Sequence, residues 1–276
     1  MFDVCVVGHV TRDIVQIGNR QTEMPGGTAY YASLAMKFLG MDVAVVTTIG
    51  KDSKYLLEHL YRNNISVFFR DSPRSTTFIN NYTDDMRQRI QRVTATALPF
   101  TVMDIRSIQA SVFHLGPLNR DEIPPDIIRT LSARSTVSLD VQGFLRTLQD
   151  GQVVLTDWPD KEEALRYVTI LKTDEEEARI LSGETDLERM AARLSGLGPR
   201  EVIITRGNKG SLIYSAGRSH TIPACAPHIP VDPTGCGDTY MAGYLFMRLI
   251  THSPAETGDY AARLATAKLE RSGPLY

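Results

Sequence analysis

Short apolar runs alternate with stretches of helical periodicity along the chain. Buried-strand runs cover 4–8, 43–49 and 65–69, and apolar residues recur at helical spacing over 28–39 and 53–62. This β-α-β-α-β order predicts a parallel sheet with helices on both faces. The alternation resumes with predicted strands at 111–115, 137–139, 168–171, 201–205, 211–215 and 219–222 and predicted helices starting near 123 and covering 174–181, 187–197, 237–250 and 254–270.

Residues 72–96 interrupt this pattern. Residues 75–82 and 87–94 alternate, are rich in Thr, Asn, Arg and Gln, and flank Asp84-Asp85, which predicts a polar hairpin that residues 13–23 could join. Because such a hairpin has no core to bury, it is either a solvent-exposed flap or a lid over a site. The simplest organisation is one domain, 1–276, with a lid formed by about 12–24 and 72–96.

Composition and charge exclude several classes of protein. With 42% hydrophobic and 22% charged residues the chain is of ordinary globular type, and its net charge of −2 gives no sign of a nucleic-acid or membrane surface. Cys5, Cys225 and Cys236 are widely spaced and form no metal-type pair, which favours reduced thiols and a cytoplasmic protein. The N-terminus lacks the features of a signal peptide, and no apolar run reaches membrane-spanning length.

The segment Asp232-Pro-Thr-Gly-Cys-Gly-Asp238 carries the clearest chemistry. Gly235 and Gly237 allow the backbone to curl tightly just where a helix begins, so loop amides meet the positive end of a helix and form an anion site, most naturally for phosphate. Asp238 then places a carboxylate beside that site. The sequence leaves two interpretations of it open, a general base or a helix cap.

Four further polar clusters fall at the ends of predicted elements. Each has a functional and a structural interpretation. Asp13 either accepts hydrogen bonds from substrate hydroxyls or is a solvated loop residue, and Gly26-Gly27 either allow close approach to a ligand or form a turn. Asp174 and Glu177 either hold hydrated Mg²⁺ or begin a solvated helix, and the segment Thr205-Arg-Gly207-Asn-Lys-Gly210 either wraps a nucleotide or is a tight hairpin. No Walker A sequence occurs. The absence of a spaced-glycine fingerprint after the first strand disfavours a nicotinamide-dependent Rossmann enzyme.

Taken in order, these clusters resemble the ribokinase-like carbohydrate kinases, the PfkB family, over nearly the whole chain. The segment 232–238 is similar to the family's D-T-x-G-A-G-D signature, with proline at the second position and Cys236 in place of alanine. Residues 25–40 resemble the N-terminal signature, with Tyr31 where asparagine is usual. Asp174-Glu-Glu-Glu177 resembles N-x-x-E with aspartate for asparagine, and 205–210 resembles the T-x-G-x-x-G nucleotide loop.

The resemblance implies an α/β fold: a three-layer α/β/α sandwich with a mostly parallel central sheet and a small β lid. It implies ATP bound at Thr205, Gly207, Gly210, Thr234 and Asp174, and Mg²⁺ positioned through water by Glu177. Many members also use a monovalent cation such as K⁺, which would lie by Asp232 and Thr234. A homodimer through the lid is expected, because lids of this family often pair.

These expectations combine into an in-line phosphoryl transfer to a sugar, polyol or nucleoside hydroxyl. Asp238 is the expected base, and the amides of Gly235, Cys236 and Gly237 stabilise the transferred group. Asp13, Gly26, Gly27 and Tyr31 are the expected acceptor-binding residues, with the Tyr31 ring able to stack on a substrate ring. Residues 140–146 are similar to a stretch of the myo-inositol kinase branch and point towards a polyol. The alternative function is a non-catalytic sugar or nucleotide sensor on the same fold, which the presence of Asp238 disfavours.

Overall fold

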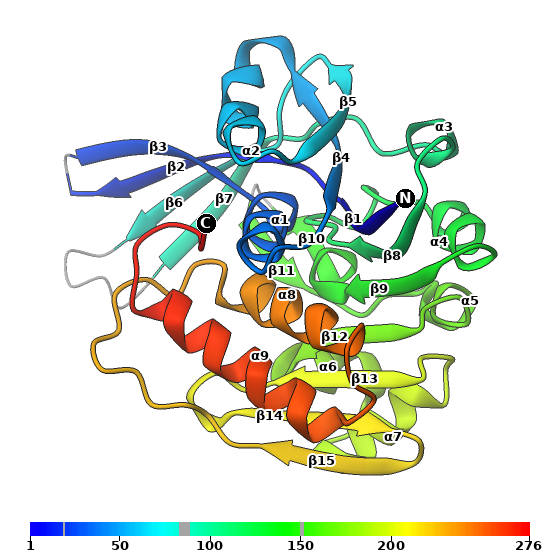
Figure 1. The fold of residues 1–276 in the computed structure, drawn as a ribbon. Helices are drawn as coiled ribbons and strands as arrows, with labels where there is room; N and C mark the ends of the chain where they lie inside the picture. Colours follow the sequence, from blue (N-terminus) through cyan, green and yellow to red (C-terminus); the bar gives the residue numbers. More distant parts are fainter. Residues whose placement is uncertain (19, 83–88, 150–151) are drawn as a thin grey trace.

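A central sheet organises the computed structural model, which describes residues 1–18, 20–82, 89–149 and 152–276 (Figure 1). Its strand order is β15-β14-β13-β12-β9-β8-β1-β4-β5. The strands are β1 (Phe2–Val7), β4 (Val43–Gly50), β5 (Ser66–Ser72), β8 (Ala110–Leu115), β9 (Thr136–Asp140), β12 (Ile170–Asp174), β13 (Glu201–Thr205), β14 (Ser211–Ser215) and β15 (Arg218–Ile222). Pairing is parallel from β5 to β13 and antiparallel between β13, β14 and β15.

Helices cover both faces of this sheet. On one side lie α1 (Thr28–Phe38), the 3₁₀ helix η1 (Lys51–Leu57) with α2 (Glu58–Arg62), α8 (Cys236–Arg248) and α9 (Pro254–Leu269); on the other lie α3 (Val102–Ile105), α4 (Pro125–Ser132), α5 (Lys161–Leu165), α6 (Glu175–Ser182) and α7 (Leu187–Ser195).

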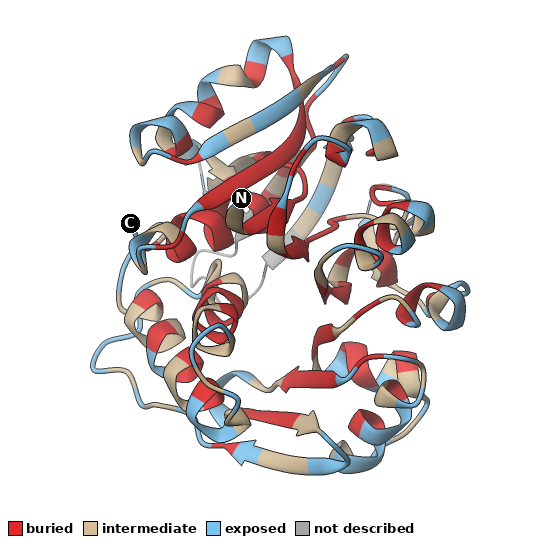
Figure 2. Ribbon diagram, turned by 45° about the vertical axis from the view of Figure 1, so that its right-hand side comes forward, coloured by how far each residue is buried: buried red, intermediate tan, exposed pale blue. Residues whose placement is uncertain are grey.

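Strand β1 shows how alternation builds the two cores. Val4 and Val6 pack with α1 and α8, whereas Cys5 and Val7 pack in the opposite core with α3 to α7. Both cores consist of buried apolar side chains, and the central strands are buried along most of their length (Figure 2). The expected three-layer α/β/α arrangement with a mostly parallel sheet is confirmed.

A second, six-stranded sheet forms the small β lid. Its order is β10-β11-β7-β6-β2-β3. Its strands are β2 (Thr11–Ile17), β3 (Arg20–Gly26), β6 (Thr77–Tyr82), β7 (Arg89–Ala95), β10 (Arg146–Gln149) and β11 (Gln152–Leu155). The first hairpin joins the second through parallel pairing of β2 with β6.

Two features of the lid differ from the sequence expectations. Strands β10 and β11, of four residues each, extend the sheet although no periodicity marked them, because such short strands give too little pattern to detect. Asp13 lies within strand β2, paired opposite Met24, and is not a loop residue. The expected turn at Asp84-Asp85 lies outside the described residues. Among the described helices, none has the length and apolar character needed to cross a membrane.

Candidate active site

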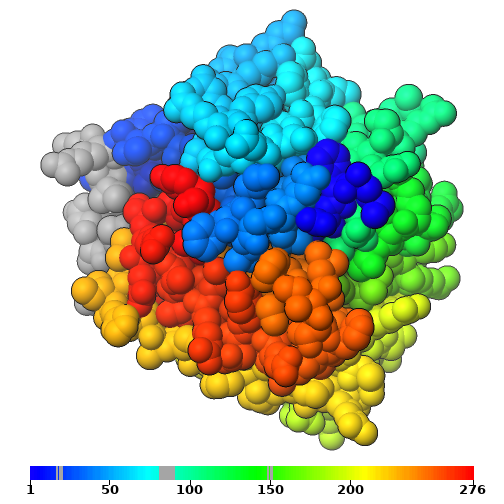
Figure 3. All heavy atoms as spheres, in the orientation of Figure 1, coloured from blue at the N-terminus to red at the C-terminus, as the bar shows by residue number. Residues whose placement is uncertain are grey.

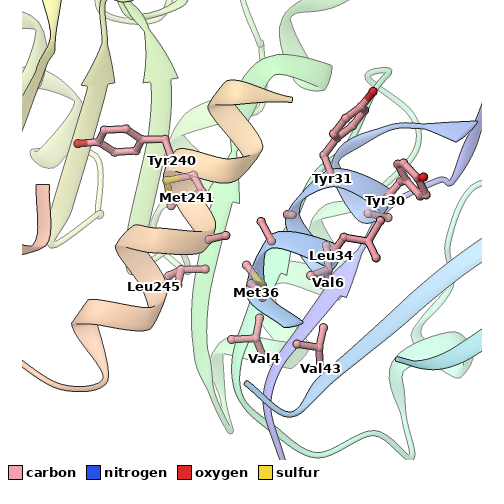
Figure 4. Close-up of a cluster of buried hydrophobic side chains, with 14 of the residues drawn as sticks. Val4, Val6, Tyr30, Tyr31, Leu34, Met36, Val43, Tyr240, Met241 and Leu245 are labelled. Carbon is pink, nitrogen blue, oxygen red and sulfur yellow. The ribbon is translucent and has the colours of Figure 1, made fainter. Parts of the chain in front are cut away.

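Two glycine-led helix starts meet at one edge of the central sheet. Gly27 (φ 88°) precedes α1 and Gly235 (φ 75°) precedes α8, so both helices begin with backbone conformations that favour glycine. A Cβ on Gly27 would overlap the carbonyl oxygen of His9, and one on Gly235 would overlap the ring of Tyr31. Helices α1 and α8 then pack against each other, which fixes the two loops relative to one another (Figure 4).

Asp238 lies in the first turn of α8 and is a half-buried residue. It does not cap the helix, because the N-cap residue is Gly235 and α8 has no side-chain cap hydrogen bond. Thr28, the first residue of α1, donates a hydrogen bond to its carboxylate. Burial, reinforced by the negative charge of Asp140, raises the Asp238 pKa from 3.8 to about 6, against the lowering effect of Lys172, Thr28 and Arg146. The structure thus removes the capping interpretation.

A buried ion pair lies beneath this turn, and sequence reasoning assigned it no role. Lys172, on β12, donates to Asp140 Oδ2 at 2.8 Å across to the neighbouring strand β9, and both side chains are buried. A Cβ on Gly237 would lie 3.4 Å from Lys172 Nζ, so the ammonium lies directly behind the loop 232–237, which we call the anion loop after the site predicted there. Burial alone would lower the Lys172 pKa, but Asp140, Glu177 and Asp238 raise it, so the group is charged. The available signal was a lysine at the end of an apolar strand run.

Asp174 and Glu177 form a capping box at the start of α6. Asp174 Oδ1 accepts from the Glu177 amide and Glu177 Oε2 accepts from the Asp174 amide, each at 2.8 Å. Burial raises the pKa of Glu177 to about 7; Lys172 opposes this, while Asp140 and Asp174 add to it. No cluster of three His, Cys, Asp or Glu side chains suited to a metal occurs among the described residues. This donor set fits a Mg²⁺ ion that keeps its water ligands and takes its other ligands from phosphates.

A cavity of about 670 Å³ opens beside the anion loop. The predicted nucleotide residues Thr205, Gly207 and Gly210 line it together with Cys236 and Gly237 of α8. The remaining wall is mostly apolar and consists of Asn208, Ala224, Cys225, Ala226, Pro227, Pro230, Pro233, Tyr240, Ala262, Ala265, Thr266 and Leu269. Thr234 and Asp174 do not line this cavity, although Asp174 pairs in register with Thr205 on the adjacent strand. A cavity of this size and character suits a ligand with a flat apolar part.

The predicted acceptor residues gather where the lid joins α1. The Asp13 carboxylate accepts from the Thr11 hydroxyl at 2.7 Å and fills the space that a Cβ on Gly26 would need. Tyr31 is only 3% exposed, and its ring lies over Gly235. Little of the ring face is therefore open to a substrate, and Tyr31 supports the anion loop from behind instead of offering the stacking surface expected from the sequence.

Asp232, the expected neighbour of a monovalent cation, is held on every side. Its Oδ1 accepts from the Thr234 amide at 2.9 Å and its Oδ2 from the Gly273 amide at 3.2 Å. Lys268 Nζ lies 3.4 Å from Oδ2. Partial burial would raise the Asp232 pKa, but the hydrogen bonds from Thr234 and Gly273 and the charge of Lys268 hold the pKa below its usual value. The Cys236 amide, expected to face the donor, lies 3.2 Å from the carbonyl oxygen of Pro233 and donates to it.

This geometry matches a known family. The model of the pfkB family carbohydrate kinases matches residues 1–276. The chain belongs to this family. A cytidine kinase from Thermococcus kodakarensis is 30% identical over 252 residues, which cover 89% of this chain and 88% of the relative. An inositol 3-kinase from Arabidopsis thaliana is 24% identical over 88% of this chain and 67% of its own length.

Solved structures agree with this assignment. A pyrophosphate-dependent kinase of the ribokinase family, in complex with a pyrophosphate analogue and myo-inositol, superposes with a TM-score of 0.90 at 26% identity, over 99% of this chain and 97% of that chain. This pfkB-family protein is therefore an enzyme of the class that phosphorylates sugars and related alcohols. The relatives differ in phosphoryl donor and in acceptor, so membership of the family leaves both open.

Proposed function

We propose that this pfkB-family enzyme transfers the γ-phosphoryl group of ATP to a hydroxyl of a small polyol, sugar or nucleoside, with Asp238 as general base. The observation that carries the proposal is the position of Asp238. Asp238 follows Gly237, which lines the donor cavity, and its carboxylate accepts a hydrogen bond from Thr28 at the start of α1, on the proposed acceptor side. With a pKa of about 6 the group is ionised at neutral pH and still basic enough to take a proton.

In the proposed reaction the acceptor oxygen attacks the γ-phosphorus. The hydroxyl proton passes to Asp238, and the bond from phosphorus to the bridging oxygen of ADP breaks. The amides of Gly235 and Gly237, at the start of α8, hold the transferred group, with the Lys172 ammonium behind them. The Cys236 amide contributes less, because it already donates to Pro233. Glu177 and Asp174 would hold Mg²⁺ through water ligands, and the ion would supply positive charge to the donor phosphates.

ATP is favoured as donor by the cavity beside the loop. Its volume of about 670 Å³ and its largely apolar wall suit a nucleobase, which inorganic pyrophosphate lacks. Pyrophosphate is the second candidate, because the matched kinase with a TM-score of 0.90 is pyrophosphate-dependent. Exclusion of water by the lid, the lid-mediated homodimer and the cytoplasmic location stay predictions.

A myo-inositol-like polyol is the acceptor we favour, and cytidine is the second. Two relatives support the polyol, the inositol 3-kinase from Arabidopsis thaliana and the kinase solved with myo-inositol. The similarity of the stretch 140–146 to the myo-inositol kinase branch adds to this, and two of its residues, Asp140 and Arg146, act on the Asp238 pKa. The 30% identity with a cytidine kinase makes a nucleoside the second candidate acceptor.

A matrix of donors against acceptors tests the proposal. ATP and pyrophosphate would each be combined with myo-inositol, cytidine, ribose and fructose, and phosphorylated product would be measured directly by phosphorus NMR. We expect product with ATP and one alcohol class. Product with pyrophosphate but not with ATP would show that pyrophosphate is the donor. Calorimetric binding of an alcohol without product from any pair would instead support the sensor.

The pH dependence of kcat/KM gives a separate test of the base. Asp238 must be deprotonated to accept a proton, so kcat/KM should fall as the pH drops below about 6, well above the 3.8 of an ordinary aspartate. Lys172 lowers this pKa, so Lys172→Met should move the acidic limb to higher pH. Lys54→Met, which breaks a surface pair with Asp71, is the control and should leave the limb in place. A limb near pH 4 in the wild type would contradict the assignment.

A further inference from the structure

Lys268, in the last turn of α9, carries a fully buried ammonium group. Its Nζ donates to the carbonyl oxygen of Asp232 at 2.9 Å and to that of Arg271 at 3.2 Å, and lies 3.4 Å from Asp232 Oδ2. The side chain has no exposed surface. Three oxygens from two separate segments therefore surround one positive charge immediately before the anion loop.

This arrangement differs from ordinary helix capping by a lysine. A lysine near a helix C-terminus normally keeps its head group in water and contacts the last carbonyls of its own helix. Here two of the three oxygens belong to Asp232, 36 residues earlier in the chain, and the Lys268 side chain has no exposed surface. Burying a charge is costly unless oxygens replace its hydration, so such a complete oxygen shell indicates a dedicated cation site.

The contacts of Lys268 lead directly to the 232–237 loop. Asp232 Oδ1 holds the Thr234 amide and Oδ2 holds the Gly273 amide. From there the chain continues through the Pro233–Cys236 hydrogen bond into α8. One ammonium thus ties the C-terminal segment to the start of the anion loop. Figure 3 shows that segment, in red, at the surface near the N-terminal hairpin, in blue.

We propose that the Lys268 ammonium is a built-in monovalent cation and that this enzyme works without K⁺. Resemblance to the family placed such an ion by Asp232 and Thr234, but the residues present do not fit a free ion, because Nζ already takes the oxygens of Asp232 and Arg271. Lys268 is a positioning residue, acting on the donor phosphates through the 232–237 loop. Only the turnover measurement in the test below depends on the proposed phosphoryl transfer.

The test compares the wild type with Lys268→Ala in KCl and in tetramethylammonium chloride at equal ionic strength. Thermal unfolding midpoint, calorimetric affinity for ADP, and turnover would be measured. We expect the wild type to give the same values in both salts. Lys268→Ala should lower turnover on the order of 10²-fold, because small displacements of positioned groups have effects of this size. K⁺ or ethylammonium should enter the vacated oxygen shell, restore part of the turnover and raise the unfolding midpoint.

Two further variants make the result unambiguous. Lys268→Met keeps most of the side-chain volume without the charge, so it should be slow and should not respond to K⁺. Arg263→Ala, on the exposed side of the same helix, removes only a surface pair with Asp259 and should match the wild type. A wild type whose midpoint or turnover depends specifically on K⁺ would overturn the proposal, as would a Lys268→Ala protein that responds to neither cation. The unfolding midpoint and the ADP affinity test the cation proposal even if no acceptor gives turnover. Failure of this proposal can therefore be distinguished from failure of the proposed function.

Discussion

Asp238→Asn should lower turnover by about 10²–10⁴-fold while leaving donor affinity nearly unchanged. The amide keeps the size of the carboxylate and can still meet the Thr28 hydroxyl, but it cannot accept the proton of the attacking alcohol. The donor cavity is lined by the neighbouring Gly237 and not by the Asp238 side chain, so ADP binding has no reason to change. Single-turnover kinetics with saturating donor and acceptor, together with ADP calorimetry, would measure both quantities.

The matched control is Asp259→Asn, which removes an exposed carboxylate paired with Arg263 on α9. It should behave as the wild type in both measurements. Asp238→Asn with wild-type turnover would remove Asp238 from the role of base. A parallel loss of ADP affinity would instead mean that the residue organises the donor site.

Gly235→Ala should reduce turnover on the order of 10²-fold and weaken donor binding. Its φ of 75° costs an alanine roughly 1–2 kcal/mol, and the new methyl group would overlap the ring of Tyr31. Because Tyr31 is buried, the ring cannot swing into solvent and the loop must move instead. The displaced amides then no longer face the donor phosphates. Turnover and ADP affinity would be measured as above.

Gly217→Ala separates backbone strain from the steric effect. Gly217, between β14 and β15, has a φ of 76° but nothing within 4 Å of an added Cβ. It should lose a similar amount of stability in thermal unfolding and retain full turnover. The double variant Gly235→Ala, Tyr31→Ala should recover part of the donor affinity, since it relieves the overlap and keeps the strain. Equal turnover in Gly235→Ala and the wild type would refute the loop model.

The alternation of apolar runs was sufficient to predict the main sheet and its helices. It works because a strand buried on both faces and an amphipathic helix each have a period that shows in the order of residues. The lid hairpin at β6 and β7 was likewise visible from its polar alternation. Strands β10 and β11 were not, because strands of four residues have no measurable period.

The candidate site divides in a similar way. Gly27 and Gly235 could be identified because a conformational requirement is local and selects one residue type. The roles of Tyr31, Asp174 and Glu177 could not be read from spacing. The structure shows the first supporting the loop and the other two forming a capping box, since burial and partners decide what a side chain is free to contact.

The sequence by itself therefore determined the layer order, the anion loop at the start of α8 and the carboxylate of Asp238 beside it. Only the tertiary structure decided that Lys172 lies behind that loop with Asp140, and that the Lys268 ammonium binds the oxygens of Asp232. The physical reason is that each of these contacts joins residues more than 30 positions apart. Their charge states depend on burial and on partners that no local pattern encodes.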